Sequence, residues 1–440
     1  MVLNLGDLSG DPVVVLGLGR DMGPAMRHLV KAKPRHIVVV DASPVTARSR
    51  LNEMGLAAIP VLGELRPAPV STVAVRSPGY PLYDPEVQRR VRDGMVTTTP
   101  MDLWLGERGR LPSVALTGTK GKSSTTVLTA TALSRLGLAP RALGNIGVSP
   151  WEAEPATGEH PVLEMSSFVC ADLHTGTTVA ALTAIAEDHI DWHGSLDRYH
   201  RDKARLFHMS PLGGQASWRG VLDDVFLPPA FDGAPMARVP APGGGVRERN
   251  CTIAAAAALA AANPGQSLDG EALDALARDL MDAYPQLPGR FSTVAIAGGV
   301  EYIDDALASN PLGLSAALGS VADREAVFIV GGRDRGADLR SVLLRLGDRP
   351  AHSSIVCIDD ARHLAADLRP HLYAVEVAGS LEDAVRRAGR LVGSGGAVVF
   401  SPAMPTPPDQ GDWQARSNRF RAAVARMTGT SVEPANPGAS

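Results

Sequence analysis

The sequence predicts an α/β protein built from three domains. Its 440 residues exceed the roughly 250–300 residues at which a single hydrophobic core stops growing. Short apolar, β-branched runs alternate with helical patterns through most of the chain, which is typical of sheets covered by helices. The apolar fraction of 45% and the charged fraction of 20% are those of an ordinary globular protein.

The first domain is expected over residues 1–110. Val13–Leu16 predicts a buried strand, and Gly17 and Gly19 follow it directly, ahead of a helical stretch. The next apolar run, Ile37–Val40, ends on Asp41. This order of strand, glycines, helix, strand and acid is the start of a doubly wound α/β unit.

A second domain is expected over residues 111–288 and a third over residues 289–428, with a frayed tail at 429–440. The second opens on a buried-strand pattern at Ser113–Thr117 and ends in the proline-rich stretch Tyr284–Pro288. Within it, Pro228–Gly245 is crowded with proline and glycine and predicts a loop. The third contains strand-like runs at Val327–Val330, Ile355–Ile358 and Ala397–Phe400.

Composition excludes several classes of protein. A net charge of −4 and a pI near 6.3 are unlike the basic face of a nucleic-acid-binding protein, so no nucleic-acid partner is expected. The 3 cysteines lie far apart, which favours a reducing compartment. The first residues lack the pattern of a signal peptide, and the alanine-rich run at Ile253–Ala262 is shorter than the roughly 20 residues that span a bilayer. We expect a cytoplasmic protein without membrane insertion.

The strongest local signal is a glycine loop between a buried strand and a helix. Such loops direct backbone N–H groups at phosphate oxygens, a lysine neutralises phosphate charge, and a hydroxyl group is placed for Mg²⁺. Leu116 stands where the general nucleotide-loop pattern has glycine, and a turn without a ligand is the alternative interpretation. The candidate phosphate-binding residues are Gly118, Thr119, Lys120, Gly121, Lys122, Ser123 and Ser124.

This loop and six further segments, in order along most of the chain, resemble the Mur ligases, the ATP-dependent amino-acid ligases of peptidoglycan precursor synthesis. Each segment alone is a weak signal, whereas seven in order at plausible spacings are specific. The segments are Thr117–Ser124, Gly144–Gly147, Leu163–Phe168, Glu187–Ser195 with Lys203, Gly289–Phe291 with Asp304–Asp305, Gly331–Gly336 and Ser401–Ala403.

The resemblance implies an N-terminal Rossmann-like domain for a uridine-diphosphate substrate, a central P-loop ATPase domain and a C-terminal Rossmann-like domain for an amino acid. It implies ATP and Mg²⁺, with Ser123, Glu164 and His189 as metal ligands. It also implies a second metal site through a carbamylated lysine at Lys203. Taken singly, Glu164 could instead be a surface carboxylate, His189 a structural histidine and Lys203 an exposed helix charge.

Further roles carry over position by position. On the nucleotide side, Asn250 matches the asparagine that reads adenine, Arg290 would touch the γ-phosphate, and Asp305 would touch the ribose or make the closed-domain contact. Arg335 would be a catalytic cation near the acyl-phosphate or the amino-acid carboxylate. The other catalytic residues would be Lys122, Glu164, His189 and Lys203. The expected substrate-binding residues are Gly17, Gly19, Asp41, Ser77, Asn145, Ser166, Thr406 and Trp413.

Within the family, the chain is most similar to the branch that adds glutamate to UDP-N-acetylmuramoyl-L-alanine. Leu307 stands where the D-glutamate enzymes have a lysine, and this favours the sister group that adds L-glutamate. Arg249 and Ile253 replace two polar residues of the adenine-side pattern. Such changes would suit a ligase acting on another acceptor in secondary metabolism. A monomer is expected.

Other classes remain open from sequence. A folylpolyglutamate or cyanophycin-type ligase would lack a domain ahead of the glycine loop. A nucleotide-binding protein that has lost turnover would bind ATP without releasing phosphate. A dehydrogenase would bind NAD(H), and it would leave the second and third domains without a role.

Overall fold

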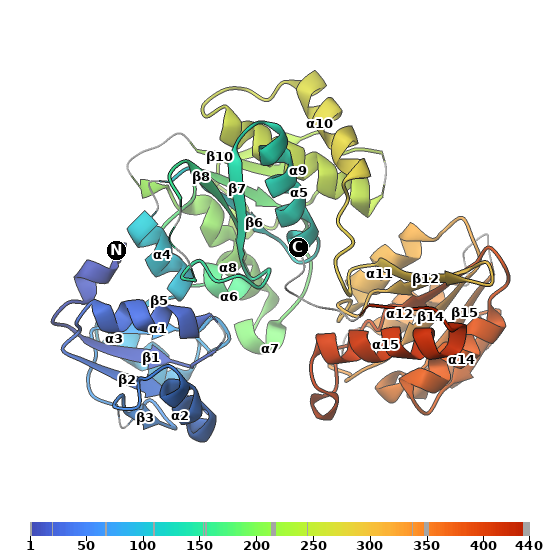
Figure 1. Cartoon of the computed structure of the whole chain (residues 1–440), viewed down its shortest axis with the longest axis horizontal. Helices are drawn as coiled ribbons and strands as arrows, with labels where there is room; N and C mark the ends of the chain where they lie inside the picture. Colours follow the sequence, from blue (N-terminus) through green and yellow to red (C-terminus); the bar gives the residue numbers. More distant parts are fainter. Residues whose placement is uncertain are drawn as a thin grey trace. The chain divides into compact units, whose positions relative to one another are not determined.

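The protein, described as a computed structural model, contains three β-sheets with helices packed on them (Figure 1). The structure describes residues 2–19, 21–66, 68–108, 111–152, 154, 156–212, 217–243, 245–336, 338–346 and 352–433. Two compact units are present, residues 1–284 with the first two sheets and residues 285–440 with the third. Each predicted segment therefore contains one sheet, and the α/β fold class is confirmed.

The first sheet has strand order β3-β2-β1-β4-β5, and all its strands are parallel. This is the order of a Rossmann-like sheet, in which ligands bind beyond the carboxyl ends of the strands where the order reverses. The strands are β1 (Pro12–Leu16), β2 (His36–Val40), β3 (Val61–Leu62), β4 (Val73–Arg76) and β5 (Val96–Thr98). The helices are α1 (Met22–Lys31), α2 (Pro44–Glu53), α3 (Pro85–Arg92) and α4 (Pro100–Arg108), after a 3-10 turn at Leu5–Leu8.

The alternation of side chains in β1 explains why both faces of this sheet are covered. Val13 and Val15 are buried in a cluster with the apolar side chains of α1 and α2, while Val14 and Leu16 are buried against α3. Successive residues of a strand point to opposite faces, so a continuous apolar run requires helices on both. Asp21, which is not a side-chain cap, precedes α1.

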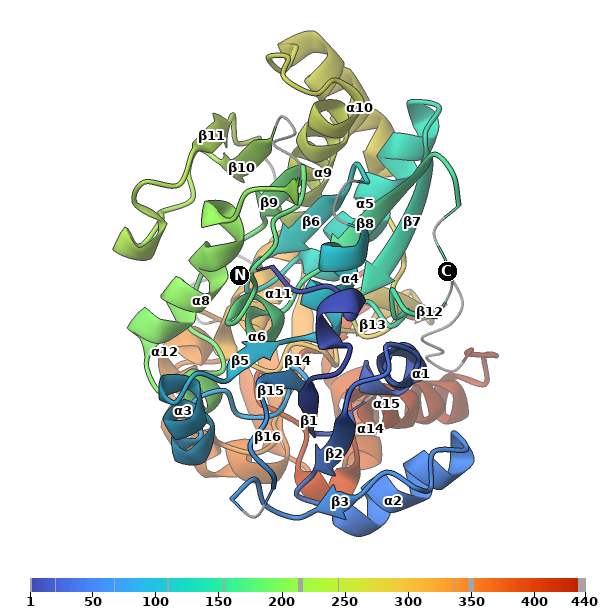
Figure 2. The ribbon, with the colours of Figure 1, turned by 90° about the vertical axis from the view of Figure 1, so that its left-hand side faces the viewer.

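The second sheet has strand order β11-β10-β9-β6-β8-β7 and is also parallel throughout. Figure 2 shows α5 beside α9. The strands are β6 (Val114–Thr117), β7 (Ala139–Gly144), β8 (Glu159–Glu164), β9 (Val179–Leu182), β10 (Trp218–Leu222) and β11 (Met236–Val239). The helices are α5 (Lys122–Arg135), α6 (Ser167–Cys170), α7 (Ile190–His193), α8 (Leu196–His208), α9 (Val246–Ala262) and α10 (Gly270–Asp282).

The alanine-rich run of the sequence forms the buried part of α9. Ile253 and the following alanines pack with α5 and α10 over the strands, because small side chains allow the helices to approach closely. The prediction of a loop throughout Pro228–Gly245 is wrong in part. It contains a short 3-10 helix, Pro229–Phe231, and β11, which pairs with β10 at the sheet edge. The four residues of β11 were not predicted because prolines and glycines surround them in the sequence.

The third sheet has strand order β12-β13-β17-β14-β15-β16, in which only the β12–β13 pair is antiparallel. One buried cluster joins it to α11 and α12, and another joins it to α14 and α15. The strands are β12 (Ser292–Ala297), β13 (Val300–Asp304), β14 (Ala326–Val330), β15 (Ser353–Cys357), β16 (Ala374–Val377) and β17 (Ala397–Phe400). The helices are α11 (Pro311–Ser320), α12 (Leu339–Leu344), α13 (Ala365–Leu368), α14 (Leu381–Leu391) and α15 (Trp413–Thr428), with 3-10 turns at Asp359–Leu364 and Pro408–Gln410.

Two predictions about boundaries are only partly covered by this description. The predicted frayed tail begins directly after α15, and its residues 434–440 lie outside the described residues. The domain limits at 110/111 and 288/289 stay predictions, because the compact units divide the chain only at 284/285.

Candidate functional site

The glycine loop lies at the carboxyl end of β6, in the middle of the second sheet, and leads into the N-terminus of α5. Gly118 and Gly121 have φ angles of +148° and +87°, a region that favours glycine. A Cβ atom at Gly118 would also lie 2.1 Å from Thr183 Oγ1. The two glycines therefore allow the backbone to fold tightly just before the N-terminus of α5, a 14-residue helix.

Two lysines from different elements converge on one carbonyl oxygen of this loop. Lys122 Nζ donates to Gly118 O at 2.9 Å and to Thr119 O at 3.1 Å. Lys203 Nζ, on α8, donates to the same Gly118 oxygen at 2.9 Å. Two ammonium groups at one acceptor repel each other, so the arrangement favours an anion beside them.

Hydroxyl groups fix the loop on its other side. Thr119 Oγ1 lies 2.7 Å from Tyr199 Oη and donates to Ala186 O at 3.0 Å. Thr183 Oγ1 donates to Lys120 O at 2.5 Å. Ser123 and Ser124 are buried in the first turn of α5. All the predicted phosphate-binding residues are thus together in one ordered turn.

Glu164 ends β8, next to β6, and is only 2% exposed. Its Oε1 atom accepts from Asn145 Nδ2 at 2.9 Å, whereas Oε2 is buried without a hydrogen-bond partner among the described residues. A buried carboxylate oxygen without a partner is costly, and a cation would relieve that cost. The alternative interpretation of Glu164 as a surface carboxylate is excluded by its burial.

Lys203 is likewise buried, at 2% exposure, so it is not an exposed helix charge. Burial and the nearby positive charge of Lys122 lower the pKa of Lys203 to about 7. A lysine with this pKa has a neutral amine available near neutral pH.

His189 directly precedes α7 as its N-cap, in a conformation unusual for histidine, with a φ angle of +51°. Its ring lies 4.8 Å from the Phe168 ring, and its Nε2 atom lies 3.8 Å from Asp188 Oδ2. Partial burial lowers the pKa of His189, while Asp188 opposes the shift. A neutral imidazole is the form that binds metals. Among the described residues, no group of three or more His, Cys, Asp or Glu side chains could hold a metal by itself.

A buried chain of polar groups runs from Tyr83 to the start of α6. Tyr83 Oη donates to Asp202 Oδ1 at 2.6 Å, His193 Nδ1 lies 2.6 Å from Asp202 Oδ2, and His193 Nε2 lies 3.0 Å from Ser167 Oγ. Ser166, a predicted substrate residue, accepts from Val169 N and caps α6. This chain joins the loop after β4 to α8, which carries Lys203.

The predicted residues of the first sheet also come together at its carboxyl edge. A Cβ atom at Gly19 would lie 2.4 Å from Ser77 Oγ, and one at Gly17 would lie 3.3 Å from Ser77 Cβ. Asp41 accepts from Leu18 N at 2.8 Å and from Ser43 N at 2.8 Å. The carboxylate therefore joins the glycine loop after β1 to the loop that follows β2.

Asn250 lies in the first half of α9 and is buried beside the phosphate loop. Its Nδ2 atom donates to Tyr284 Oη at 2.8 Å. Arg249, which replaces a polar family residue, pairs with Asp224 at 2.8 Å. Ile253 is buried in the core of this unit.

In the second unit, the loops after β13, β14 and β17 meet. Asp305 Oδ2 accepts from Ser401 Oγ at 2.8 Å. Gly331 N donates to Pro402 O at 3.0 Å and Arg333 N to Pro405 O at 2.9 Å, which brings the loop of Arg335 beside the loop of Thr406. Arg335 and its neighbours are exposed, whereas Thr406 is half-buried.

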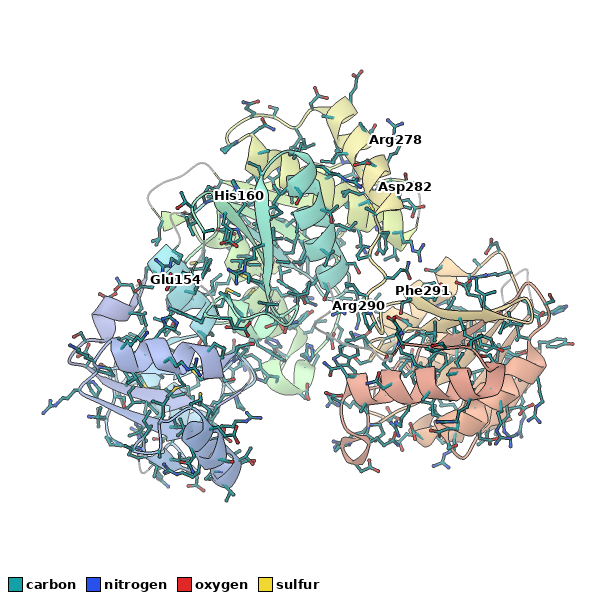
Figure 3. All side chains as sticks on the ribbon, viewed as in Figure 1. Glu154, His160, Arg278, Asp282, Arg290 and Phe291 are labelled. Atoms are coloured by element: carbon teal, nitrogen blue, oxygen red, sulfur yellow. The ribbon has the colours of Figure 1, made fainter. Side chains whose placement is uncertain are left out.

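Trp413 and Arg290 belong to one cluster in this unit. Figure 3 labels Arg290 and Phe291, which lie on the segment that leads into β12. The Arg290 guanidinium lies 5.7 Å from the centre of the Trp413 ring, and a Cβ atom at Gly289 would lie 2.9 Å from that ring. Leu307 N donates to Gly289 O at 3.0 Å, so Leu307 lies next to Gly289 in this cluster.

Several residues of these sites had no signal in the sequence. Tyr199, Thr183, Tyr83, Asp202 and Tyr284 belong to no motif and reach the site only through the fold. Arg416, a fully buried residue of α15, donates to Met404 O at 3.0 Å and Ala306 O at 2.8 Å.

No helix within the described ranges has the length and apolarity to cross a membrane.

Comparison with known proteins identifies two family domains in the chain. Residues 116–219 match the Mur ligase middle domain, and residues 289–404 match the Mur ligase glutamate ligase domain. The two matches include the phosphate loop, Glu164, His189 and Lys203, and the loops of Asp305 and Arg335.

Relatives match over nearly the whole chain. A UDP-N-acetylmuramoyl-L-alanine–L-glutamate ligase from a Micromonospora species is 32% identical over 97% of this chain and 99% of its own length. The enzyme of the same name from Salinispora tropica is 30% identical over 97% of this chain and 100% of its own. A UDP-N-acetylmuramoylalanine–D-glutamate ligase from Rubrobacter xylanophilus is 32% identical over 94% and 98%.

Solved structures share the fold at low sequence identity. MurF from Acinetobacter baumannii has a TM-score of 0.57 at 17% identity, covering 96% of this chain and 91% of that one. The UDP-N-acetylmuramate–alanine ligase MurC from Thermotoga maritima has a TM-score of 0.53 at 16% identity, covering 96% and 100%. The predicted resemblance is confirmed by the domain matches and by the relatives, and the chain belongs to the Mur ligase family.

Proposed function

We propose that this protein is an ATP-dependent, ADP-forming ligase that joins glutamate to the carboxylate of UDP-N-acetylmuramoyl-L-alanine in peptidoglycan precursor synthesis. The substrate carboxylate attacks the γ-phosphate of ATP and becomes an acyl-phosphate. The glutamate amine then adds to the acyl carbon, and the tetrahedral intermediate expels inorganic phosphate. The names of the relatives support this substrate pair.

One observation carries the proposal: Lys122 and Lys203 both donate to Gly118 O, at the carboxyl end of the strand next to that of Glu164. Bringing a carboxylate to a triphosphate joins two anions, so neutralising their charge is the main catalytic task. Lys122 is the residue that supplies this charge to the phosphates. Gly118, Thr119, Lys120 and Gly121 supply the backbone that surrounds them.

The residues near the loop fit Mg²⁺, which prefers oxygen ligands. Glu164 would hold it through Oε2, the buried oxygen without a protein partner. Ser123 and His189 would complete the protein ligands. The metal supplies charge neutralisation at the phosphate oxygens, and Asn145 keeps the Glu164 carboxylate oriented through its 2.9 Å hydrogen bond.

Lys203 would hold a second Mg²⁺ as a carbamate. Carbon dioxide reacts with a neutral amine, and burial beside Lys122 makes this form of Lys203 accessible near pH 7. The reaction turns the amine into an anionic oxygen ligand. It also removes the repulsion between two ammonium groups at Gly118 O.

The substrates would bind at the first and third sheets. Gly17, Gly19, Asp41 and Ser77 would bind the uridine diphosphate, with Asn145 and Ser166 nearer the reacting carboxylate. Arg290 and Asp305 would bind the nucleotide. Arg335, Thr406 and Trp413 would bind the amino acid. The division into domains at 1–110, 111–288 and 289–428, a monomeric state and a cytoplasmic location belong to the same proposal.

L-glutamate is favoured over D-glutamate as the amino acid. Leu307, next to the Gly289–Trp413 cluster, has no charge to offer the glutamate side-chain carboxylate. Relatives named for L-glutamate and for D-glutamate are about equally similar to this chain, at 32% identity each, so similarity alone does not choose between the enantiomers.

The test is release of phosphate from ATP and Mg²⁺ in the presence of UDP-N-acetylmuramoyl-L-alanine, with L-glutamate, D-glutamate or no amino acid. We expect release that depends on L-glutamate and on the sugar peptide. Release with D-glutamate alone would reverse the enantiomer. ATP binding without release in any mixture would indicate another acceptor or a protein that has lost turnover.

A further inference from the structure

Tyr284 is the last residue of the first unit and belongs to none of the motifs of the family. Its ring packs against the apolar cluster of α5, α9 and α10. The guanidinium of Arg247, in the first turn of α9, lies 5.2 Å from the centre of the ring. A cation at this distance over an aromatic ring is attracted to it. The ring is therefore fixed from two sides, and its hydroxyl group has a defined position.

That hydroxyl group contacts two residues of the nucleotide site. It accepts from Asn250 Nδ2 at 2.8 Å. The side chain of Ser124, in the first turn of α5, lies close to the same hydroxyl group. Asn250 and Ser124 are both buried, so the hydrogen bond between Asn250 and Tyr284 is shielded from water.

The other end of the Asn250 amide lies against the phosphate loop. A Cβ atom at Gly121 would lie only 2.8 Å from Asn250 Oδ1. Gly121 is the residue before α5 and has a φ angle of +87°, so its placement sets the direction of the first N–H groups of the helix. Both ends of the Asn250 amide thus face protein atoms, one at Tyr284 and one at the loop.

We propose that Tyr284 is a positioning residue for the phosphate loop, acting through Asn250. This inference rests on the proposed function, since it assigns a further role within the same ATP site. The hydroxyl group holds the Asn250 amide against Gly121, the residue that precedes α5. The backbone N–H groups are then oriented for phosphate before the nucleotide binds, which lowers the cost of ordering the loop.

The proposal differs from adenine recognition by Asn250 in what it predicts for other ligands. An amide that reads adenine contributes only to nucleotides with that base. An amide that positions the loop contributes to every ligand with a polyphosphate group. The ratio of the dissociation constants for these ligands therefore separates the two roles.

The experiment measures dissociation constants of Mg²⁺-ATP, Mg²⁺-GTP and Mg²⁺-tripolyphosphate for the full chain and for Tyr284→Phe, which keeps the ring but removes the hydroxyl group. We expect the variant to bind all three more weakly by a similar factor of about five, the effect of one hydrogen bond. Asn250→Ala should give a similar common factor. The double variant should lose little more than either single one, because the two residues act as a unit.

Tyr302→Phe is the matched control, since it removes a hydroxyl group from a buried tyrosine of the second unit. Its three dissociation constants should equal those of the unchanged protein. A loss confined to ATP in the Tyr284 variant would overturn the proposal in favour of base recognition, and unchanged binding of all three would also overturn it. If the unchanged protein binds none of the three ligands, the proposed function fails and this inference fails with it.

Discussion

Lys203 Nζ lies 2.9 Å from Gly118 O, the same oxygen that accepts a hydrogen bond from Lys122. The two lysines are 81 positions apart in the sequence and come together because α8 packs near the carboxyl end of β6. Burial, together with the nearby ammonium group of Lys122, lowers the pKa of Lys203 to about 7. The site is electrostatically arranged for anions.

Replacing Lys122 tests the charge at the phosphate loop. Lys122→Ala should lower kcat at least about 100-fold, because transition-state charge on the phosphates loses a preorganised donor. Circular dichroism should remain unchanged. Lys31→Ala removes an exposed lysine at the end of α1 and should keep full activity. Full activity of the Lys122 variant would remove the phosphate-loop assignment.

The state of Lys203 should depend on pH and on carbon dioxide. Its folded-state pKa, about 7, lies below the ordinary value of 10.5, so the unfolded chain binds more protons between these limits. For the unmodified amine, the free energy of unfolding therefore rises as pH increases through this range, and the neutral amine becomes available as pH passes 7.

Carbamate formation should follow the same direction. Carbon-13 NMR of protein in labelled bicarbonate should give a carbamate signal that grows as pH rises from 6 to 8. This range extends about one pH unit to either side of the pKa of Lys203. Lys203→Gln should lack the signal, whereas Lys122→Gln should retain it. A signal of equal size in the Lys203 variant would place the carbamate on another amine.

Metal affinity should depend on Glu164 and on its partner Asn145. Asn145→Ala removes the hydrogen bond that orients the carboxylate and should weaken Mg²⁺ binding about 10- to 100-fold. Glu164→Gln removes the charge and should weaken it more. Manganese binding followed by electron paramagnetic resonance measures this without turnover. Glu53→Gln, an exposed residue at the end of α2, is the control, and equal manganese affinity in all variants would contradict the role of Glu164.

The polar chain from Tyr83 to Ser167 should stabilise the first unit. Tyr83→Phe removes one buried hydrogen bond and should cost about 1 kcal/mol of unfolding free energy. His193→Ala leaves two buried partners unsatisfied and should cost about 2–4 kcal/mol. Thermal unfolding of both variants measures the difference. Tyr373→Phe, at an exposed tyrosine, should change nothing, and a His193 variant as stable as this control would contradict the account.

Leu307 should influence the choice of glutamate enantiomer. Leu307→Lys introduces a cation beside Gly289 and should raise kcat/KM for D-glutamate relative to L-glutamate about tenfold, since a hydrogen bond to a charged group contributes about 1.5–3 kcal/mol. Leu307→Met changes shape without charge and should keep the original preference. An unchanged ratio in the lysine variant would show that the enantiomer is selected elsewhere.

The fold and the position of the loop could be predicted because their signals are local. The apolar run at Val114–Thr117 predicts a strand, and the glycines after it fix where the loop begins. The strands at Val327, Ile355 and Ala397 are confirmed for the same reason. The edge strand β11 was missed because Met236–Val239 is short and lies among prolines.

The side-chain connections could not be predicted, because they depend on contacts between distant residues. No pattern links Tyr284 to Asn250, or Tyr83 to Asp202, which are separated by 34 and 119 positions. The apolar neighbours Leu163 and Met165 indicate that Glu164 is buried, whereas the burial of Lys203 could be inferred only from the family. Among the described residues, Glu164 Oε2 has no hydrogen-bond partner, and Lys203 shares the Gly118 oxygen with Lys122. Both features follow from the packing of the strands and α8.

The most direct test of the central claim, an acyl-phosphate formed from the substrate carboxylate, is oxygen transfer. UDP-N-acetylmuramoyl-L-alanine labelled with oxygen-18 in its carboxylate is incubated with ATP, Mg²⁺ and L-glutamate, and the released phosphate is analysed by mass. The account predicts one labelled oxygen in each phosphate, because the attacking carboxylate oxygen leaves with it. Phosphate without label would mean that water attacks ATP, and it would contradict the ligase mechanism.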